Sequence, residues 1–265
     1  MGSSLVLHLR TKGLRSTLKK VANKAGALVR NSSVKKHSRH EWEAFYQAFE
    51  LRFRGRPEDL TERLRDRYAG LLQNHFQSSG AGVQRAIDLG CGHGEFLQVL
   101  SECGFWGLGI DFSAQAIETT RAKGLEAISS DTLRYLKRVP TGSISLVSCL
   151  HMIEHCDPEY NFLLVREVRR CLKPGGLLIL ETPSILSLWA GHRQFYLDPT
   201  HEKPVHPDYL RFMCQYHGFK ETEIREFGDV EHPVRGHLDP GDQEALKRWD
   251  KWLFGPMDLC CLARN

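Results

Sequence analysis

The chain has 265 residues, of which 41% are hydrophobic and 26% charged, and its formal net charge is +4 at pH 7. This length allows one α/β core with an additional segment, and no apolar run approaches the ~20 residues that a membrane-spanning helix needs. The eight cysteines include no C-x-x-C pair and lie mostly in apolar runs, which is typical of small core residues in a reducing compartment. We therefore expect a cytoplasmic protein with one main domain.

The N-terminal segment, residues 1–40, differs in charge from the rest of the chain. It holds ten Lys and Arg and no acid, whereas the remaining 225 residues hold 26 basic and 32 acidic side chains. Its apolar residues recur at helical spacing, which predicts a basic amphipathic helix. Residues 1–38 could contact an anionic membrane surface, bind RNA, act as a mitochondrial presequence or form a solvated arm. We favour the membrane surface, which would make the protein peripheral at a membrane; RNA is the least favoured of the four, and DNA is not an expected partner.

Residues 41–82 are predicted to form a helical segment. Apolar and aromatic side chains recur at helical spacing up to Phe53, and a second helical pattern begins at Pro57. We expect this segment to cap one edge of the sheet that follows it in the chain. Arg52 and Arg54 are candidate contacts to an anionic acceptor, although solvated helix charges explain both arginines equally well.

The remaining residues, 83–265, alternate between strand and helix patterns at the spacing of βαβ units. Asp157-Pro158 combines a helix N-cap with proline at the first helical position, and Lys173-Pro174-Gly175-Gly176 should end that helix. The alternation predicts an α/β domain with a Rossmann-like, doubly wound parallel sheet. We expect helices at 94–103, 113–123, 132–138, 157–172 and 207–216, and strands at 85–89, 106–111, 126–131, 143–150, 176–182, 219–227 and 257–263.

A glycine-rich turn follows the first of these strands. The strand contains Asp88 near its end, and Gly90, Gly92 and Gly94 follow at alternate positions. Glycine allows positive φ and leaves no Cβ between backbone and ligand, so the turn is suited to binding a nucleotide or nucleoside. The third glycine comes one residue too early for the G-x-G-x-x-G turn that holds a dinucleotide pyrophosphate.

Two further strands are also followed by acids, Asp111 and Asp131. The whole ordered set resembles the class I S-adenosylmethionine-dependent methyltransferases. The resemblance implies S-adenosyl-L-methionine as cofactor and a seven-stranded sheet whose last strand is antiparallel. Its expected cofactor-binding residues are Asp88, Gly90, Gly92 and Gly94 at the methionyl and ribose portions, Asp111 at the ribose hydroxyls, Asp131 at the adenine amine and Phe112 beside the adenine ring.

The strand 143–150 ends in His151-Met152-Ile153-Glu154-His155, and open parallel sheets bind ligands beyond the carboxyl ends of their strands. H-x-x-E-H is also the zinc motif of inverted zincins, but these residues lie between a buried strand and a new helix cap, so no long helix is available and no metal is expected. Histidine near neutral pH can remove a proton from an acceptor hydroxyl. We predict His155 as this base, with His151 and Glu154 orienting acceptor or cofactor. A loop histidine bonded to backbone is the alternative for each, and an anionic acceptor such as a phosphate would need no base.

The segment 184–206 is too long for an ordinary connection and rich in aromatic and polar groups, which predicts a lid over the acceptor. Tyr196, Asp198 and His201 are its candidate acceptor-binding residues, although Asp198-Pro199-Thr200 could simply form a turn.

Four separated runs resemble bacterial methyltransferases of surface-polysaccharide clusters, nearest to the methyltransferase part of O-antigen chain-terminating methyltransferase/kinase enzymes. They are Phe45–Gly55, Glu181–Ser184, Phe195–His201 and Leu253–Asp258. This resemblance implies a role in polysaccharide biosynthesis, with O-methylation of a sugar hydroxyl or terminal phosphate of a glycan or glycolipid. A small-molecule or RNA methyltransferase and a noncatalytic nucleoside-binding module are the alternatives.

Overall fold

The computed structural model describes residues 37–76, 83–228 and 252–265. It divides into two units, Met1–Arg56 and Pro57–Asn265. The basic segment predicted as an amphipathic helix lies almost entirely outside the described residues. Within the described ranges, no helix combines the length and apolar content that crossing a membrane would require.

The described part of the first unit contains helix α2 (His37–Phe53). Aromatic rings follow one another along it, with centroid distances of 5.8 Å between Tyr46 and Phe49 and 4.9 Å between Phe49 and Phe53. Arg54, just after the helix, pairs with Glu50 at 3.0 Å and donates to the Tyr46 hydroxyl at 3.3 Å. Arg52 is exposed. Acceptor binding by these arginines stays a prediction, as does the role of segment 41–82 as a cap.

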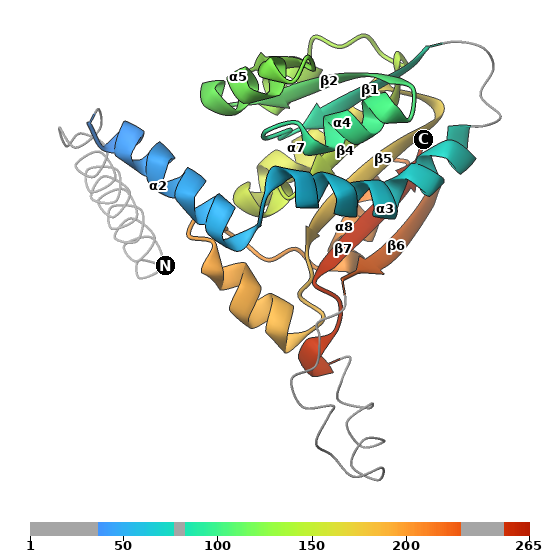
Figure 1. Ribbon diagram of the computed structural model, residues 1–265. Coiled ribbons are helices and arrows are strands. Elements are labelled where there is room, and N and C mark those ends of the chain that lie inside the picture. The colour runs from blue at the N-terminus through green and yellow to red at the C-terminus, as the bar shows by residue number, and fades with distance from the viewer. Residues whose placement is uncertain (1–36, 77–82, 229–251) are drawn as a thin grey trace, which may run out of the picture. The chain divides into compact units, whose positions relative to one another are not determined.

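The second unit is built on a seven-stranded sheet in the order β3-β2-β1-β4-β5-β7-β6 (Figure 1). The first five strands are parallel, and β7 runs antiparallel to both β5 and β6. The Rossmann-like sheet with an antiparallel last strand is therefore confirmed. The strands are β1 Gln84–Leu89, β2 Phe105–Asp111, β3 Glu126–Ser129, β4 Ile144–Leu150, β5 Leu172–Pro183, β6 Glu221–Phe227 and β7 Asp258–Arg264.

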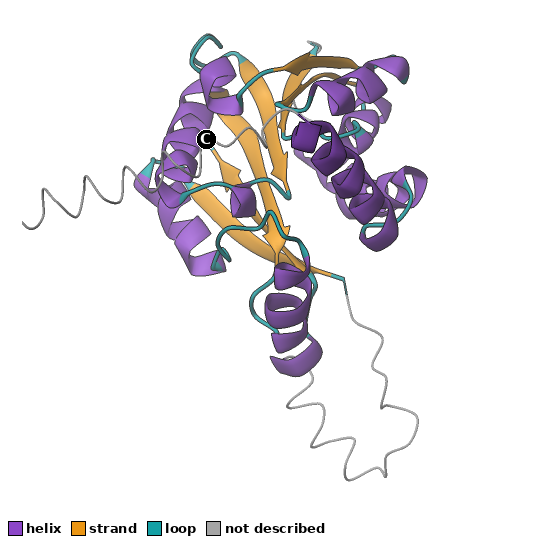
Figure 2. Ribbon diagram, turned by 90° about the vertical axis from the view of Figure 1, so that its left-hand side faces the viewer, coloured by secondary structure: helices purple, strands orange, loops and turns teal. Residues whose placement is uncertain are grey.

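Helices cover both faces of this sheet, as Figure 2 shows. Helices α3, α4 and α5 pack on one face, and α6, α7 and α8 pack on the other. Neighbouring residues of a strand alternate between the two cores: Leu177 and Ile179 belong to the first, and Leu178 and Leu180 to the second. The helices are α3 Pro57–Phe76, α4 Glu95–Glu102, α5 Ala114–Ala122, α6 Thr132–Leu136, α7 Pro158–Cys171 and α8 Pro207–Tyr216.

The start of α7 follows the predicted capping chemistry. The Asp157 side chain accepts from the Tyr160 N–H at 2.9 Å, and Pro158 occupies the first turn, where it needs no N–H partner. The end of α7 at Cys171 is also close to the prediction, but β5 begins directly at Leu172. The run 173–176 forms an irregularity in β5, because Ile144 pairs with Leu172 while Leu146 pairs with Leu177.

The segment 184–206 has more regular structure than a loop. It contains a π-helical turn, η3 (Trp189–Gln194), and a 3₁₀ turn, η4 (Phe195–Leu197). Both turns are shorter than the window in which helical periodicity can be recognised, so the sequence pattern indicated only a long connection.

Two glycine substitutions test the packing between β2 and α4. A Cβ at Gly109 would lie 2.5 Å from Cys91 Sγ and from Leu97 Cδ1, whereas a Cβ at Gly70 in α3 would have no atom within 4 Å. We expect Gly109→Ala to lower the free energy of unfolding by about 1–3 kcal/mol. Gly70→Ala should raise it by about 0.5–1 kcal/mol, because alanine is the better helix former. Urea denaturation measures both, and equal stability of the two variants would contradict the packing described.

Candidate active site

The glycine turn predicted from the sequence adopts the conformation that requires glycine. Gly90, Gly92 and Gly94 have φ angles of +69°, +52° and +85°. A Cβ at Gly90 would lie 2.8 Å from Met152 Cγ, so the turn packs directly on the residue that follows His151. At Gly92 the nearest atom to such a Cβ would be Glu95 Oε2 at 4.0 Å. The middle of the turn is therefore open to a ligand while its two ends are packed.

Asp111, at the end of β2, holds this turn in place. Its Oδ2 accepts from the Gly92 N–H at 3.1 Å, and its Oδ1 accepts from the Ser113 N–H at 2.8 Å. Each carboxylate oxygen has a further lone pair that can accept from a ribose hydroxyl. The neighbouring Phe112 is 79% exposed, so its ring face is available for stacking. This arrangement fits the nucleoside end of the predicted cofactor.

Asp131 lies on the neighbouring strand end, two residues after β3. It caps α6 by accepting from the Arg134 N–H at 2.7 Å, and its other oxygen accepts from the Tyr160 hydroxyl at 2.8 Å. The side chain remains exposed, as an adenine contact requires. Tyr160 was not recognised from the sequence, because it comes from the first turn of α7.

Asp88 differs from the other two acids because it is buried under the turn. It is 2% exposed, and its Oδ1 accepts from Ser148 Oγ of β4 at 2.7 Å. Burial raises the pKa of Asp88 to about 7, with Glu95 and Asp111 adding to the rise. Of the three acids expected at the rim, only Asp131 is exposed, because Asp111 is 9% and Asp88 2% exposed. A direct cofactor contact by Asp88 stays a prediction.

His151 follows β4 in an unusual backbone conformation. Its φ of +51° is the one positive value among the non-glycine residues that the structure describes. Nδ1 of its ring lies 3.3 Å from Glu154 Oε1, and Nε2 lies 3.2 Å from Glu181 Oε1. Burial alone would lower the pKa of His151, but hydrogen bonds to these carboxylates raise it to about 10. His151 is therefore an imidazolium at neutral pH and does not act as a base.

The carboxylates around His151 are shared with α3. Arg67 pairs with Glu181 at 2.8 Å and with Asp258 at 2.8 Å, and the Tyr68 hydroxyl donates to Glu181. Asp258 also lies 3.6 Å from His151 Nε2. We call these five residues and Glu154 the His151 cluster. The sequence pattern did not predict Arg67, Tyr68, Glu181 and Asp258 as members of a site. The one local signal was Glu181, an acid within the apolar run of β5.

Glu154 and His155 connect the end of β4 to the segment 184–206. Glu154 is fully buried, and its Oε2 accepts from Thr182 Oγ1 at 3.1 Å. Burial is the largest single influence on the pKa of Glu154 and would raise it, but the hydrogen bond and charge of His151, with smaller contributions from His155 and the backbone, together lower it. The His155 Nδ1 lies 2.9 Å from Thr200 Oγ1 and 3.2 Å from Thr200 O. The structure thus brings the predicted base together with the lid.

The three acceptor candidates of the lid have different surroundings. Tyr196 is 70% exposed. Asp198 is 6% exposed and accepts from Thr200, while the His201 side chain is 6% exposed and its Nδ1 donates to Phe195 O at 2.7 Å. Asp198 and His201 are therefore buried and hydrogen-bonded inside the protein, whereas Tyr196 is open to solvent. Acceptor contact by all three residues stays a prediction.

Two groups of described residues bring possible metal-ligand atoms within 4.8 Å of one another, namely Glu154 with His155 and His201, and His151 with Glu181 and Asp258. In the second group, the positively charged His151 ring already pairs with the carboxylates of Glu181 and Asp258. Residues Ile153–His155 form a single 3₁₀ turn, so the two histidines do not share a helix face as in inverted zincins. A metal-free site stays a prediction.

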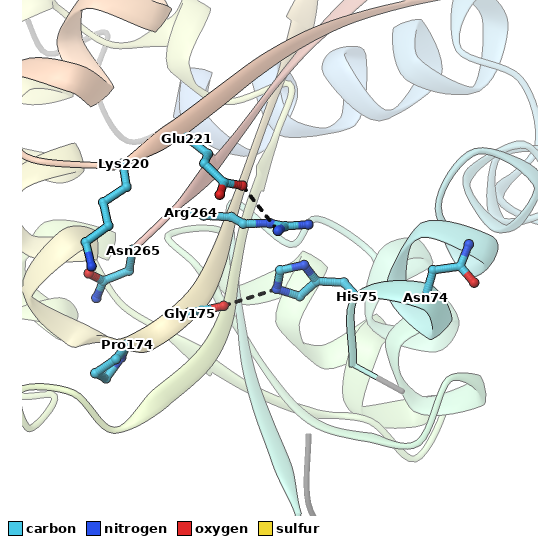
Figure 3. Close-up of a pocket in the computed structure, with 8 residues that line it drawn as sticks. All are labelled: Asn74, His75, Pro174, Gly175, Lys220, Glu221, Arg264 and Asn265. Carbon is cyan, nitrogen blue, oxygen red and sulfur yellow. Dashed lines mark hydrogen bonds and ion pairs between the residues drawn. The ribbon is translucent and has the colours of Figure 1, made fainter. Parts of the chain in front are cut away.

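A surface pocket of about 450 Å³ lies at the end of the sheet opposite to the glycine turn; Figure 3 shows its lining residues. It is formed near the start of β5 and β6 and the end of β7, and Glu221 pairs there with Arg264 at 3.2 Å. His75 donates to Gly175 O at 3.1 Å. Because parallel sheets bind ligands beyond their carboxyl ends, this pocket is separate from the candidate active site.

A family model described as a methyltransferase domain matches residues 39–224. The chain belongs to this methyltransferase family. A SAM-dependent methyltransferase from Archaeoglobus fulgidus is 32% identical to it, with a TM-score of 0.73; the match covers 83% of this chain and all of that one. The protein is a SAM-dependent methyltransferase, and S-adenosylmethionine is its cofactor.

Two curated relatives are named ubiquinone biosynthesis O-methyltransferase. The one from Idiomarina loihiensis is 29% identical over 119 residues, which cover 43% of this chain and 47% of that relative. The one from Xanthomonas oryzae pv. oryzae is 34% identical over 104 residues, which cover 37% of this chain and 42% of that relative. The methyltransferase therefore spans less than half the length of these relatives. Special closeness to the O-antigen enzymes is not among these findings.

Loss of the Asp111 carboxylate tests the cofactor end of the site. Asp111→Ala removes the acceptor for the Gly92 and Ser113 N–H groups together with the expected ribose contact. We expect the affinity for S-adenosylmethionine to fall by about 10- to 100-fold, since hydrogen bonds to charged groups are involved. Isothermal titration calorimetry measures this, with Asp208→Ala, at an exposed position of α8, as the matched control. Equal affinity of both variants would contradict the assignment.

The His151 cluster predicts a particular dependence of stability on pH. The pKa of His151 in the folded protein, about 10, lies above the ordinary histidine value of 6.5. The stabilisation is therefore fully present below pH 6.5 and is lost as pH rises toward 10. We expect His151→Gln to lower the free energy of unfolding at pH 7 by about 2 kcal/mol and to flatten its decline between pH 7 and pH 10. Denaturation at a series of pH values measures both, and parallel curves for variant and wild type would refute the charged state of His151.

Proposed function

We propose that the protein transfers a methyl group to a hydroxyl oxygen of a glycan or glycolipid. One observation carries the proposal: the glycine turn packs on Met152, so the residues that hold the cofactor adjoin the segment His151–His155. His155, three residues along, has an imidazole that can accept a proton near neutral pH. A hydroxyl positioned between the cofactor and His155 would lose its proton as it gains the methyl group.

In this proposal each residue of the site has a separate role. The bound cofactor supplies an electrophilic methyl group on a sulfonium, which is displaced in line. Asp111 and the turn would hold the nucleoside, Asp131 would accept from the adenine amine and Phe112 would flank the adenine ring. His155 would take the proton of the acceptor hydroxyl. His151 cannot take that proton, because it already carries one at neutral pH. With Glu154 it orients the residues around the reacting groups.

The nature of the acceptor rests on the lid and on the sequence resemblance. Leu188, Tyr196 and Leu197 of the lid are 59%, 70% and 40% exposed, which suits an acceptor with both apolar and polar parts. The runs that resemble surface-polysaccharide methyltransferases favour a glycan or glycolipid acceptor in polysaccharide biosynthesis. If the methylated group is a terminal phosphate of that acceptor and not a hydroxyl, no base is needed. We place this enzyme in the cytoplasm, peripheral at a membrane surface. The names of the two curated relatives favour a second candidate, an intermediate of ubiquinone biosynthesis.

Transfer of tritiated methyl groups distinguishes these acceptors. The full chain is incubated with S-[methyl-³H]adenosylmethionine and a cell extract that is then separated into lipid-linked glycans, quinone lipids, nucleic acids and small metabolites. We expect label in the lipid-linked glycans. Label in the quinone lipids would support the second candidate, and label in nucleic acid would refute both. Binding of cofactor without any transfer would indicate a noncatalytic module.

Removal of the proposed base should affect turnover more than binding. General bases contribute about 10²- to 10⁴-fold to a rate, so we expect His155→Ala to lower kcat by at least about 10²-fold with the labelled fraction as acceptor. The Kd for S-adenosylmethionine should stay unchanged. His75→Ala, at the opposite end of the sheet, is the control and should behave as wild type. Wild-type turnover in His155→Ala would eliminate the base.

A further inference from the structure

His155 is joined to the lid by a short chain of hydrogen bonds. Asp198 Oδ1 lies 2.6 Å from Thr200 Oγ1, and Thr200 Oγ1 lies 2.9 Å from the His155 Nδ1. The carbonyl oxygen of Thr200 lies 3.2 Å from the same ring nitrogen. Asp198 also accepts from the Thr200 N–H at 2.9 Å, which closes an Asx turn around Pro199 and holds the threonine hydroxyl in place.

The positions of the protons in these hydrogen bonds follow from the donors that each residue offers. Thr200 has one hydroxyl proton, and its short contact with the Asp198 carboxylate takes that proton. The hydroxyl oxygen and the carbonyl oxygen of Thr200 can then only accept. The His155 Nδ1 must therefore carry the donated proton, which leaves Nε2 as the basic nitrogen of the neutral ring.

We infer that Thr200 and Asp198 are positioning residues that fix the tautomer of His155 and increase its basicity. The inference rests on the proposed transfer to a hydroxyl. In that reaction the bond from sulfur to the methyl carbon breaks, the bond from the acceptor oxygen to that carbon forms, and the hydroxyl proton moves to Nε2. The ring then holds both protons, and its positive charge is stabilised through Thr200 by the Asp198 carboxylate. The proton leaves to water when the products depart.

Other charged and titratable groups also face His155. Glu154 precedes it on the same turn and Cys156 follows it, while Asp198 and His201 come from the lid, whose Glu202 N–H donates to the Glu154 carbonyl oxygen. The His201 ring meets the His155 ring edge-on at 4.7 Å between centroids, with its Nδ1 already donating to Phe195 O. The buried Glu154 carboxylate favours an imidazolium at His155 through space. Asp198 is joined to the His155 Nδ1 by hydrogen bonds through Thr200, and the Thr200 carbonyl oxygen contacts the same nitrogen, so both direct the ring proton to Nδ1.

The tautomer can be observed without knowing the acceptor. Long-range ¹H–¹⁵N correlation spectra of the full ¹⁵N-labelled chain distinguish a protonated ring nitrogen from an unprotonated one. We expect the neutral His155 ring to be protonated at Nδ1. Thr200→Val should weaken this preference, whereas Thr200→Ser, which keeps the hydroxyl, should restore it. Asp198→Asn keeps an oxygen acceptor for Thr200 and removes the charge, so the titration midpoint of His155 should move to lower pH.

Kinetics with the tritium-labelled acceptor fraction provide the second readout. We expect Thr200→Val to lower kcat by about 10-fold or more, as is usual for residues that orient a functional histidine, with an unchanged Kd for S-adenosylmethionine. In Asp198→Asn the acidic limb of the kcat/KM profile should move to lower pH. Thr200→Ser should recover most of the wild-type rate. The melting temperature of each variant is measured as well, so that a loss of activity caused by unfolding is recognised separately.

Several outcomes would overturn the inference. One is a neutral ring protonated at Nε2 in the wild type, and another is an Asp198→Asn variant whose titration midpoint does not move. A third is loss of turnover on chelation with recovery on adding Mg²⁺ or Zn²⁺, because the His155 Nε2 would then be a metal ligand. If wild-type protein transfers label to a hydroxyl while any of these holds, the proposed function survives and the positioning role does not.

Discussion

The missing Cβ at Gly90 is the constraint on which the active site depends. A side chain there would collide with Met152, so glycine is what allows the turn after β1 to lie on the segment after β4. This contact brings the two proposed parts of the site together, since the turn is the proposed cofactor site and His155, the proposed base, follows Met152 by three residues. Asp111 then fixes the middle of the turn through the Gly92 N–H, and the left-handed backbone of all three glycines keeps that middle free of side chains.

Two histidines four residues apart differ in the groups that their ring nitrogens contact directly. His151 lies among Glu154, Glu181 and Asp258 and remains positively charged, whereas His155 contacts the uncharged oxygens of Thr200. The first is suited to holding structure and the second to exchanging a proton. The cluster around His151 also explains its strained backbone, because carboxylates from β5, β7 and the following turn over-determine the position of the ring.

The sequence predicted the order and type of the sheet elements because hydrophobic period and capping signals are local. Asp157-Pro158 marks the start of α7 to the residue, and the ends of most strands are predicted within two residues. The partners of the site residues are not local: Tyr68 meets Glu181 across 113 positions, and His155 meets Thr200 across 45. Such pairs depend on strand order and on the path of the lid, which periodicity does not encode. The same limit explains Asp88, whose burial follows from its pairing with β4 and not from its place beside the glycines.

The segment 184–206 contacts the proposed base directly. The backbone carbonyl of Glu154 accepts from the N–H groups of Glu202 and Lys203 at 2.9 and 3.3 Å, so the lid is anchored on the turn that carries the base. The same segment contributes Thr200 to His155 and exposes Tyr196 to the surroundings. A change in this segment therefore alters the acceptor surface and the proton affinity of the base together. In this chain, a substitution that reshapes the acceptor surface of the segment must keep the Thr200 oxygen acceptors if His155 is to keep its proposed tautomer.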